Sequence, residues 1–203
     1  MPQYRDHAIA LINDYAVDAA NYYDERVPLA PEYGVDGRTF RAYRDCNEAP
    51  SVIFRAWAEQ FGFAREVREQ LNTVQTYDEF LDCHTELAES LQRFWLERQG
   101  DRLGDAYLYK LIDLFIKALS KVETDFQNLN ANLVQYGHIP LDQWSLIAVR
   151  NCFYGIVIAD QPRMGLIDDY LTYMFIQPRI RELMNDAGLP NLYFDYYAWD
   201  DRG

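Results

Sequence analysis

The spacing of apolar residues along the chain predicts helices from end to end. Between residues 4 and 26, apolar side chains recur every three or four positions, which places them on one helix face: Ile9, Ile12, Ala16, Ala19 and Tyr23. Similar patterns predict helices over residues 52–62, 63–74, 76–99, 105–117, 128–136, 143–154 and 165–187. No alternating apolar and polar run of strand length occurs in the sequence. We therefore predict an all-α fold.

Short sequence signals predict where several of these helices begin and end. Ser51 is expected to cap a helix, because its hydroxyl can accept a hydrogen bond from an amide of the first turn. Thr76 and Glu79 have the spacing of a capping box, which would start a long helix. Residues 100–104 form a compact hairpin bounded by two glycines, and Pro178 is expected to kink the last long helix.

The length of 203 residues fits a single domain. Apolar residues make up 49% of the chain and aromatic residues 15%, which is enough for a substantial core. We expect one compact multi-helix domain, residues 1–203, with two helical lobes and a cleft between them. Residues 1–60 with 145–203 would form one lobe, and residues 61–144 the other. The tail, residues 191–199, is so aromatic that it should pack against the domain.

The chain is strongly acidic, with a formal net charge of −13 at pH 7. Such a charge argues against simple electrostatic attraction to nucleic acid, because phosphate groups are bound by lysine and arginine. Residues 101–150 are nearly neutral, with 5 basic and 6 acidic side chains. A local site for a polyanion is therefore compatible with this segment.

Several classes of site are disfavoured by the residues present. Cys46, Cys83 and Cys152 are odd in number and widely spaced, which is typical of free thiols in a reducing cytoplasm. The three histidines lack the spacing of metal ligands along a helix, so we expect no metal and no cofactor. No apolar run is long enough for a membrane span, and the first residues lack a signal-peptide pattern. We expect a cytoplasmic protein without a membrane partner.

Lys110 lies in a predicted helix, and Asp142 lies at the predicted start of another. A structural interpretation accounts for both. Lys110 has three- and four-residue spacing to Asp113, Lys117 and Lys121, which suits the solvent-exposed stripe of an amphipathic helix. Asp142 suits a helix N-cap. A functional interpretation instead treats Lys110 as a nucleophile and Asp142 as the group that activates it.

The functional interpretation comes from a resemblance to the helix-hairpin-helix DNA glycosylase superfamily. In that superfamily a lysine-bearing helix is followed by a proline-containing turn whose aspartate begins the next helix, and residues 139–144 here are Ile-Pro-Leu-Asp-Gln-Trp. The spacing of 32 residues from Lys110 to Asp142 is similar to that of the archaeal 8-oxoguanine glycosylase branch. That branch also has an aspartate followed one helical turn later by a tryptophan, which resembles Asp195 and Trp199.

The resemblance has three departures. The usual Leu-Pro-Gly-Val-Gly hairpin signature is absent, and residues 100–104 are a loose counterpart. The aromatic residue that the archaeal branch places one turn after the lysine is Leu114 here, with Phe115 beside it. No basic cluster flanks the hairpin.

The resemblance implies a protein that extrudes a damaged or modified, 8-oxoguanine-like base from double-stranded DNA. Lys110 would attack the sugar carbon as the base leaves and form a Schiff base, with strand cleavage as a further step. Asp142 would orient or deprotonate Lys110. Asp195 would accept hydrogen bonds from the edge of the base. A protein of this kind would be associated with the nucleoid.

The resemblance also implies an aromatic platform for the extruded base. Trp199 is the first candidate, and Trp57 or Phe115 would form the opposite wall. Each has a structural alternative. Trp199 would otherwise pin the tail to the domain, and Trp57 would be ordinary core, as aromatic residues at helical spacing usually are. Asp195 would otherwise be a turn or cap residue.

The alternative function is non-catalytic. The net charge of −13 and the aromatic tail also suit an acidic helical protein that binds another protein, with a negative surface like that of DNA. The two functions differ in geometry. A glycosylase needs Lys110 and Asp142 to converge in a pocket with aromatic walls, whereas a DNA mimic leaves Lys110 solvated and spreads its acidic residues over one face.

Overall fold

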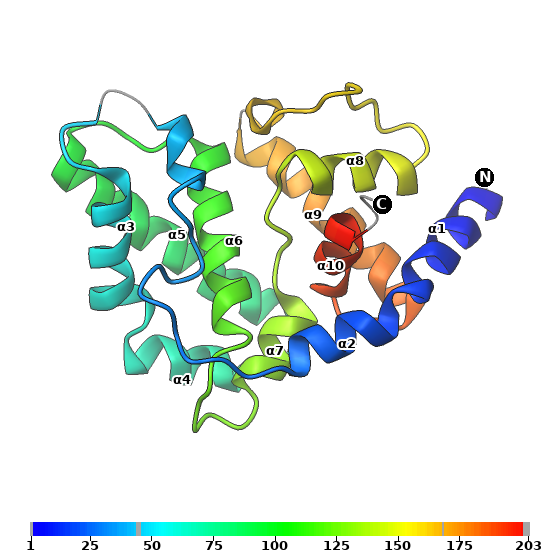
Figure 1. Ribbon diagram of the computed structural model, residues 1–203, viewed down its shortest axis with the longest axis horizontal. Coiled ribbons are helices and arrows are strands. Elements are labelled where there is room, and N and C mark those ends of the chain that lie inside the picture. Colours follow the sequence, from blue (N-terminus) through cyan, green and yellow to red (C-terminus); the bar gives the residue numbers. More distant parts are fainter. Residues whose placement is uncertain (1, 44–45, 168, 201–203) are drawn as a thin grey trace.

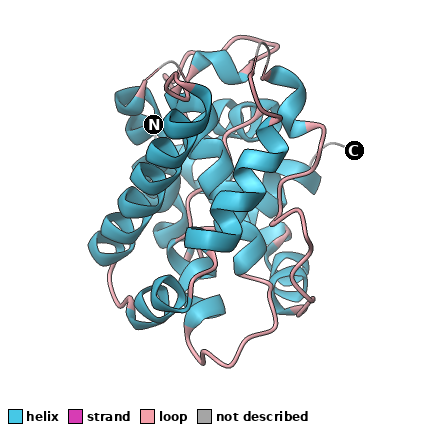
Figure 2. Cartoon of the chain, turned by 90° about the vertical axis from the view of Figure 1, so that its left-hand side faces the viewer, coloured by secondary structure: helices cyan, strands magenta, loops and turns pink. Residues whose placement is uncertain are grey.

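The computed structural model describes residues 2–43, 46–167 and 169–200. Within these ranges the chain forms helices, turns and one isolated bridge but no strand, so the predicted all-α class is confirmed (Figure 1, Figure 2). No helix in the same ranges is long and apolar enough to cross a lipid bilayer. The α-helices are α1 (Pro2–Asp14), α2 (Ala16–Asp24), α3 (Pro50–Trp57), α4 (Arg65–Thr73), α5 (Tyr77–Gln99), α6 (Asp105–Leu119), α7 (Leu129–Tyr136), α8 (Gln143–Cys152), α9 (Tyr170–Ala187) and α10 (Tyr193–Asp200).

The predicted capping box at the start of α5 is confirmed. The amide of Glu79 donates to Thr76 Oγ1 at 3.3 Å, and the amide of Thr76 donates to Glu79 Oε2 at 3.2 Å. The other end of α5 is set by Gly100, whose φ of +80° lies in the left-handed region that glycine tolerates. Both ends of this long helix therefore follow from local sequence.

Two predictions for helices in the N-terminal part are wrong. The helix expected over residues 4–26 is interrupted at Tyr15, whose amide bonds to the carbonyl of Ile12 three residues back. α3 begins at Pro50 rather than after a cap at Ser51. The fixed φ of proline suits the first helical position, where a missing amide hydrogen costs nothing.

The C-terminal part has one shifted boundary and one additional helix. α9 starts at Tyr170, not at residue 165, because the carboxylate of Asp169 accepts from the amide of Thr172 at 2.7 Å and caps the helix there. The helix continues past Pro178 to Ala187. The aromatic tail forms α10, which buries residues such as Phe194, so the tail packs against the domain as expected.

Two clusters of buried apolar residues divide the molecule into two lobes. The first cluster lies within residues 35–133 and joins α3, α5 and α6. The second draws on residues 8–23 and 134–198, from α1, α2, α8, α9 and α10. Figure 1 shows the first group on the left and the second on the right. The chain begins in the second lobe, builds the first, and then returns.

The predicted lobe boundaries near residues 60 and 145 differ from this division. α3 packs against α5, because Ile53, Phe54 and Trp57 are buried in the first cluster. The return crossing falls within α7, since Leu133 belongs to the first cluster and Val134 to the second. The apolar face of α3 could pack in either lobe, so the sequence of α3 alone did not identify the lobe to which it belongs.

α6 lies at the junction of the two lobes (Figure 1). It packs against α5 and α7 and also contacts α9. One side of α6 fills the first cluster with six apolar residues: Leu108, Leu111, Ile112, Phe115, Ile116 and Leu119. The opposite side of the helix therefore faces the second lobe.

We expect the Thr76 cap to contribute measurably to stability. Thr76→Ala should lower the free energy of unfolding by about 1 kcal/mol, because the Glu79 amide loses its acceptor. Urea denaturation followed by circular dichroism would measure the change. Thr85, exposed in the middle of α5, gives a matched control, and Thr85→Ala should change the free energy by less than about 0.5 kcal/mol. Equal losses in the two variants would contradict the assignment.

Candidate functional site

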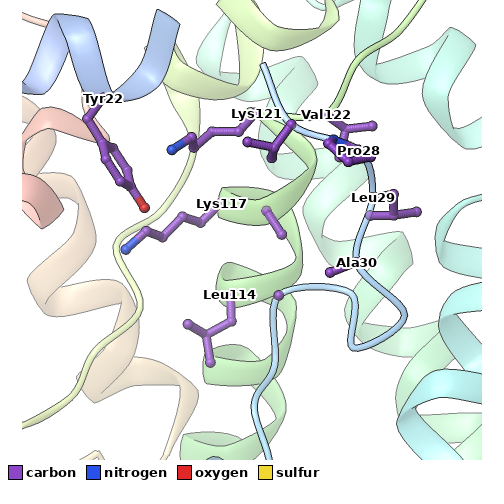
Figure 3. A pocket seen from close by; sticks show the side chains of 11 residues that line it. Tyr22, Pro28, Leu29, Ala30, Leu114, Lys117, Lys121 and Val122 are labelled. Atoms are coloured by element: carbon purple, nitrogen blue, oxygen red, sulfur yellow. The ribbon is translucent and has the colours of Figure 1, made fainter. Parts of the chain in front are cut away.

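The lysines of this chain are few and lie together. Its 19 basic residues are sixteen arginines and three lysines. The lysines are Lys110, Lys117 and Lys121, which share one side of α6 and of the turn after it. Figure 3 shows Lys117 and Lys121 extending from this side toward Tyr22. A lysine supplies an amine that can lose its proton and react, whereas arginine stays charged, so this side of α6 has a distinct chemistry.

The lysine-bearing side of α6 is enclosed rather than exposed. The interpretation of this side as a solvent-exposed stripe is wrong, because Asp113 is fully buried. The side chains of Lys117 and Lys121 are only 22% and 11% exposed, and Lys110 is half-buried. Buried charges need partners, and the second lobe supplies them.

Asp142 caps α8, as predicted, and does so with one oxygen. Its Oδ1 accepts from the amides of Trp144 at 2.8 Å and Ser145 at 3.1 Å. Ser145 Oγ accepts from the amide of Asp142 at 2.7 Å, which completes a capping box. Among the described hydrogen bonds, Oδ2 takes no part in the cap. The structural role of Asp142 therefore leaves half of its carboxylate available.

Asp142 lies within electrostatic reach of Lys110 and Asp195. Burial raises the pKa of Asp142, and the charge of Asp195 adds to this, while the Ser145 amide and Lys110 act in the opposite direction. The described contacts include no direct ion pair between Lys110 and Asp142. The predicted pair is thus near but not joined, and its carboxylate is easier to protonate than an exposed one.

Lys117 and Asp195 form a direct ion pair between α6 and α10. Lys117 Nζ lies 2.5 Å from Asp195 Oδ2, and Asp195 is 1% exposed. Burial lowers the pKa of Lys117, but the nearby Asp195 carboxylate outweighs burial and leaves that pKa raised. The buried Tyr23 hydroxyl lies near this carboxylate and interacts with it, although neither Asp195 oxygen accepts a hydrogen bond of regular geometry from a described group. The carboxylate therefore has a counter-charge and retains acceptor capacity.

A hollow of 240 Å³ opens beside this ion pair. Trp199, 37% exposed, lies on it, so Asp195 and Trp199 share one cavity. Tyr22 and Tyr196 add two further rings, with centroids 5.5 Å apart. The hollow, termed the Asp195 pocket below, is lined by Tyr22, Lys117, Asp195, Tyr196, Trp199 and Asp200.

Trp57 and Phe115 lie in the first core and do not line the Asp195 pocket. Both are fully buried, their ring centroids are 5.4 Å apart, and Trp57 Nε1 donates to Ser90 Oγ at 2.9 Å. The aromatic walls come instead from Tyr22 and Tyr196, which the sequence analysis did not identify. Tyr22 belongs to α2, and the packing of α2 against α10 is a tertiary feature with no local signal.

The sequence contained a signal that Lys117 lies beside Lys110 in the candidate site. It lies two helical turns after Lys110, and a seven-residue interval returns a side chain to the same helix face. The aspartate that pairs with it was identified from the tail. The partnership between the two could not be derived, because it depends on how α10 docks against α6.

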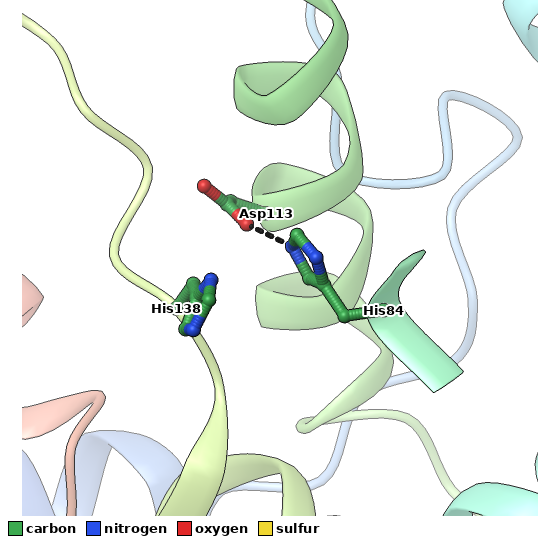
Figure 4. A group of neighbouring side chains, drawn as sticks. All are labelled: His84, Asp113 and His138. Carbon is green, nitrogen blue, oxygen red and sulfur yellow. Dashed lines mark hydrogen bonds and ion pairs between the residues drawn. The ribbon is translucent and has the colours of Figure 1, made fainter. Parts of the chain in front are cut away.

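A second group of buried polar side chains lies between the lobes (Figure 4). His84 of α5, Asp113 of α6 and His138 of the segment before α8 have ligand atoms within 4.8 Å of one another. Such a set resembles a metal centre, but hydrogen bonds already engage it. His84 Nε2 lies 2.8 Å from Asp113 Oδ1, and both ring nitrogens of His138 lie 2.7 Å from tyrosine hydroxyls.

The hydrogens of this network can be assigned by counting donors. Tyr173 has one hydroxyl hydrogen, which it donates to Asp113 Oδ2 at 2.9 Å. His138 Nδ1–H must then donate to the Tyr173 oxygen, and His138 Nε2 accepts from Tyr77. A neutral His138 satisfies every contact. Burial, reinforced by His84 and Arg181, lowers the pKa of His138 well below its usual range, which agrees with that neutral form.

Comparisons of the chain with known proteins found no relative. No protein-family model, curated protein or solved structure matches the chain. The interpretation of the site therefore depends on its residues and their geometry.

His138→Gln should flatten the pH dependence of stability. An unfolded histidine takes up a proton near pH 6.5, but the buried His138 does not, so its contribution to stability is lost as pH falls below that value. As pH falls from about 6.5 to about 5, the free energy of unfolding should fall more steeply in the wild type than in His138→Gln. The difference in slope should be up to about 1.4 kcal/mol per pH unit.

Urea denaturation across this pH range would measure both slopes. His7 is exposed on α1, so His7→Gln serves as the control and should keep the wild-type slope. Parallel curves for the wild type and His138→Gln would show that His138 is not held neutral in the folded state.

Proposed function

We propose that this protein is a DNA glycosylase-like enzyme that removes a modified, 8-oxoguanine-like base, with Lys110 as nucleophile and Asp142 as its activator. The observation that supports this proposal is that Asp142 lies within electrostatic reach of both Lys110 and Asp195. Asp195 shares a pocket with Trp199, and Lys110 and Asp142 are not among the residues that line it.

The Asp195 pocket suits an extruded base. Stacking against aromatic rings is favourable for any base, and Trp199, Tyr196 and Tyr22 supply such rings. The buried Asp195 carboxylate would accept hydrogen bonds from the N–H groups on the edge of the base. These contacts would offset the few kcal/mol that extrusion from the duplex costs.

Lys110 is a better nucleophile than Lys117. An amine attacks only in its neutral form, and the raised pKa of Lys117 in its ion pair with Asp195 keeps that residue protonated. Lys117 would instead supply the counter-charge of Asp195. Lys110 has no ion pair among the described contacts, and Asp142, which affects it electrostatically without direct contact, is the group that would take up its proton.

The chemical step follows from these positions. The Lys110 nitrogen would form a bond to the sugar carbon C1′ while the glycosidic bond breaks, and the base would depart with the electron pair of that bond. One proton of the attached nitrogen would pass to Asp142, whose pKa is raised by burial. The sugar ring would then open as its oxygen takes up the proton from Asp142, which gives a Schiff base between Lys110 and the DNA strand, and the departed base would take a proton from water.

The net charge of −13 does not oppose a local DNA site. All three lysines lie on one side of α6 and the turn after it, although Lys117 and Lys121 are paired with Asp195 and Glu25. Backbone amides at a helix start can also hold a phosphate without a basic side chain. The long-range repulsion would be weakened by salt.

A second candidate is a non-catalytic acidic protein that binds another protein as a DNA mimic. Exposed apolar side chains on the second lobe favour contact with a partner, notably Val157 at 94% and Leu171 at 76% exposure. The enclosure of Lys117 and Lys121 weighs against a mimic, because a negative recognition surface gains nothing from buried lysines.

Trapping with borohydride tests the enzymatic proposal. The protein would be incubated with duplexes containing 8-oxoguanine, uracil or an abasic site, and reduction would convert a Schiff base to a stable adduct. Because the chain has three lysines, mass spectrometry of the digested adduct identifies the attachment point directly. We expect attachment at Lys110.

Lys110→Arg is the matched variant, since it keeps the positive charge and removes the reactive amine. It should reduce adduct formation to background while leaving affinity for the duplex unchanged. An adduct that persists in Lys110→Arg, or that maps to Lys117, would contradict the assigned nucleophile. The absence of an adduct on all three duplexes would favour the DNA-mimic alternative.

Asp142→Asn should separate the capping role of Asp142 from its chemical role. Asparagine caps helices about as well as aspartate, so the free energy of unfolding should change by less than about 0.5 kcal/mol. Loss of the proton acceptor should slow adduct formation by about 100-fold or more. Single-turnover trapping and urea denaturation give the two values. A variant with wild-type trapping rate would exclude Asp142 as activator.

A further inference from the structure

A second hollow, of 320 Å³, adjoins the Asp195 pocket and shares Tyr22 and Lys117 with it. One wall is α6 with the turn that follows, and the other is the strap, residues 27–34, that leads away from α2 (Figure 3). Lys121 is the remaining charged residue on its surface. The hollow, termed the Lys121 pocket, is otherwise lined by Val27, Pro28, Leu29, Ala30, Gly34, Leu114, Ala118 and Val122.

The strap is fixed against α6 at both ends. At one end Val27 pairs with Val122, and its amide donates to the carbonyl of Lys121 at 2.9 Å. At the other end Gly34 lies so close to α6 that an added Cβ would come within 2.4 Å of Ala118 Cβ. The Gly34 φ of +82° also requires glycine. The pocket is therefore preformed, as ligand sites usually are.

Lys121 has an unusual partner for a lysine that is 11% exposed. Its ammonium lies 3.3 Å from Glu25 Oε2, but the Glu25 side chain is 64% exposed. Ion pairs with exposed carboxylates contribute little, so Glu25 can leave for water at small cost. On the other side, the ammonium is 3.5 Å from the centroid of the Tyr22 ring. A ligand anion could therefore replace Glu25 without stranding a buried charge.

We propose that the Lys121 pocket binds an organic phosphate whose anionic group takes the place of Glu25 at Lys121. The body of the ligand would lie between Pro28 and Leu29 of the strap and Leu114 of α6. Lysine is a common point-charge partner of phosphate, and a phosphate carries more charge than the carboxylate it displaces. A volume of 320 Å³ suits a compound of the size of a nucleoside monophosphate.

The phosphate can belong to a free nucleotide or to a nucleic-acid strand, and the chemistry at Lys121 is the same for both. The inference does not require base excision, because neither Lys121 nor Glu25 takes part in the step assigned to Lys110. Failure of the trapping experiment would therefore leave it intact.

Adenosine monophosphate is the first probe, with adenosine as the control that lacks the charge. Protein labelled with [ε-13C]lysine gives one NMR signal from each of its three lysines. We expect the nucleotide to shift the Lys121 signal more than that of Lys110, and adenosine to leave it unchanged. A single-stranded oligonucleotide that competes with the nucleotide would identify a nucleic-acid strand as the source of phosphate, and a lack of competition would identify a free nucleotide.

Three variants test the residues, with affinity measured by calorimetry. Lys121→Met should weaken binding by about tenfold or more, because a charge-assisted hydrogen bond is lost. Glu25→Gln should strengthen binding by about threefold, because the internal competitor is removed. Glu123→Gln makes the same charge change at an exposed residue near Lys121 and should leave the affinity unchanged.

Opposite effects of the Lys121 and Glu25 variants distinguish a ligand site from a structural ion pair. The Glu25 substitution lies at an exposed side chain, so it remains informative if Lys121→Met does not fold. The proposal would be overturned if adenosine monophosphate caused no shift of the Lys121 signal. Equal strengthening of binding in Glu25→Gln and Glu123→Gln would also overturn it.

Discussion

The Asp113 carboxylate lies fully buried where the lobes meet, and it must be paired there because an unpaired buried charge costs several kcal/mol. His84 of α5 and Tyr173 of α9 provide the hydrogen bonds, at 2.8 Å and 2.9 Å. These bonds tie α6 to both lobes and fix its rotation. Asp113 lies three residues after Lys110 and four before Lys117, so the same bonds direct both lysines toward the second lobe.

The enclosed side of α6 gathers carboxylates as well as lysines. Burial raises the pKa of Asp113 despite its hydrogen bonds, and burial likewise raises that of Asp142; Asp195 adds to both effects. Lys117 offsets this repulsion through its ion pair with Asp195. Closely placed acids with shifted pKa values are costly for folding and typical of functional sites. The same charged groups therefore determine both the stability of the junction and its proposed chemistry.

Local sequence predicted the features that depend on local bonds. The Thr76 capping box and the Asp142 cap follow from residues within a few positions of one another, and the packing of the tail was expected from its aromatic content alone. The lobe of α3 and the burial of Lys121 could not be derived, because apolar or charged spacing does not identify the neighbour that a helix face will meet. The gathering of histidines around Asp113 was missed for the same reason.

Lysine and arginine occupy different kinds of position in this chain, because their side chains differ in shape. Arginines make outer contacts, as when Arg98 pairs with Glu48 and lies over the ring of Phe94. The compact ammonium of Lys117 instead fits between Tyr22 and a buried carboxylate. Because Tyr22 and Lys117 line both hollows, an anion near Lys121 and a hydrogen-bond donor at Asp195 would act on one ion pair. The two hollows share Lys117, so a charged ligand in one would change the electrostatic field in the other.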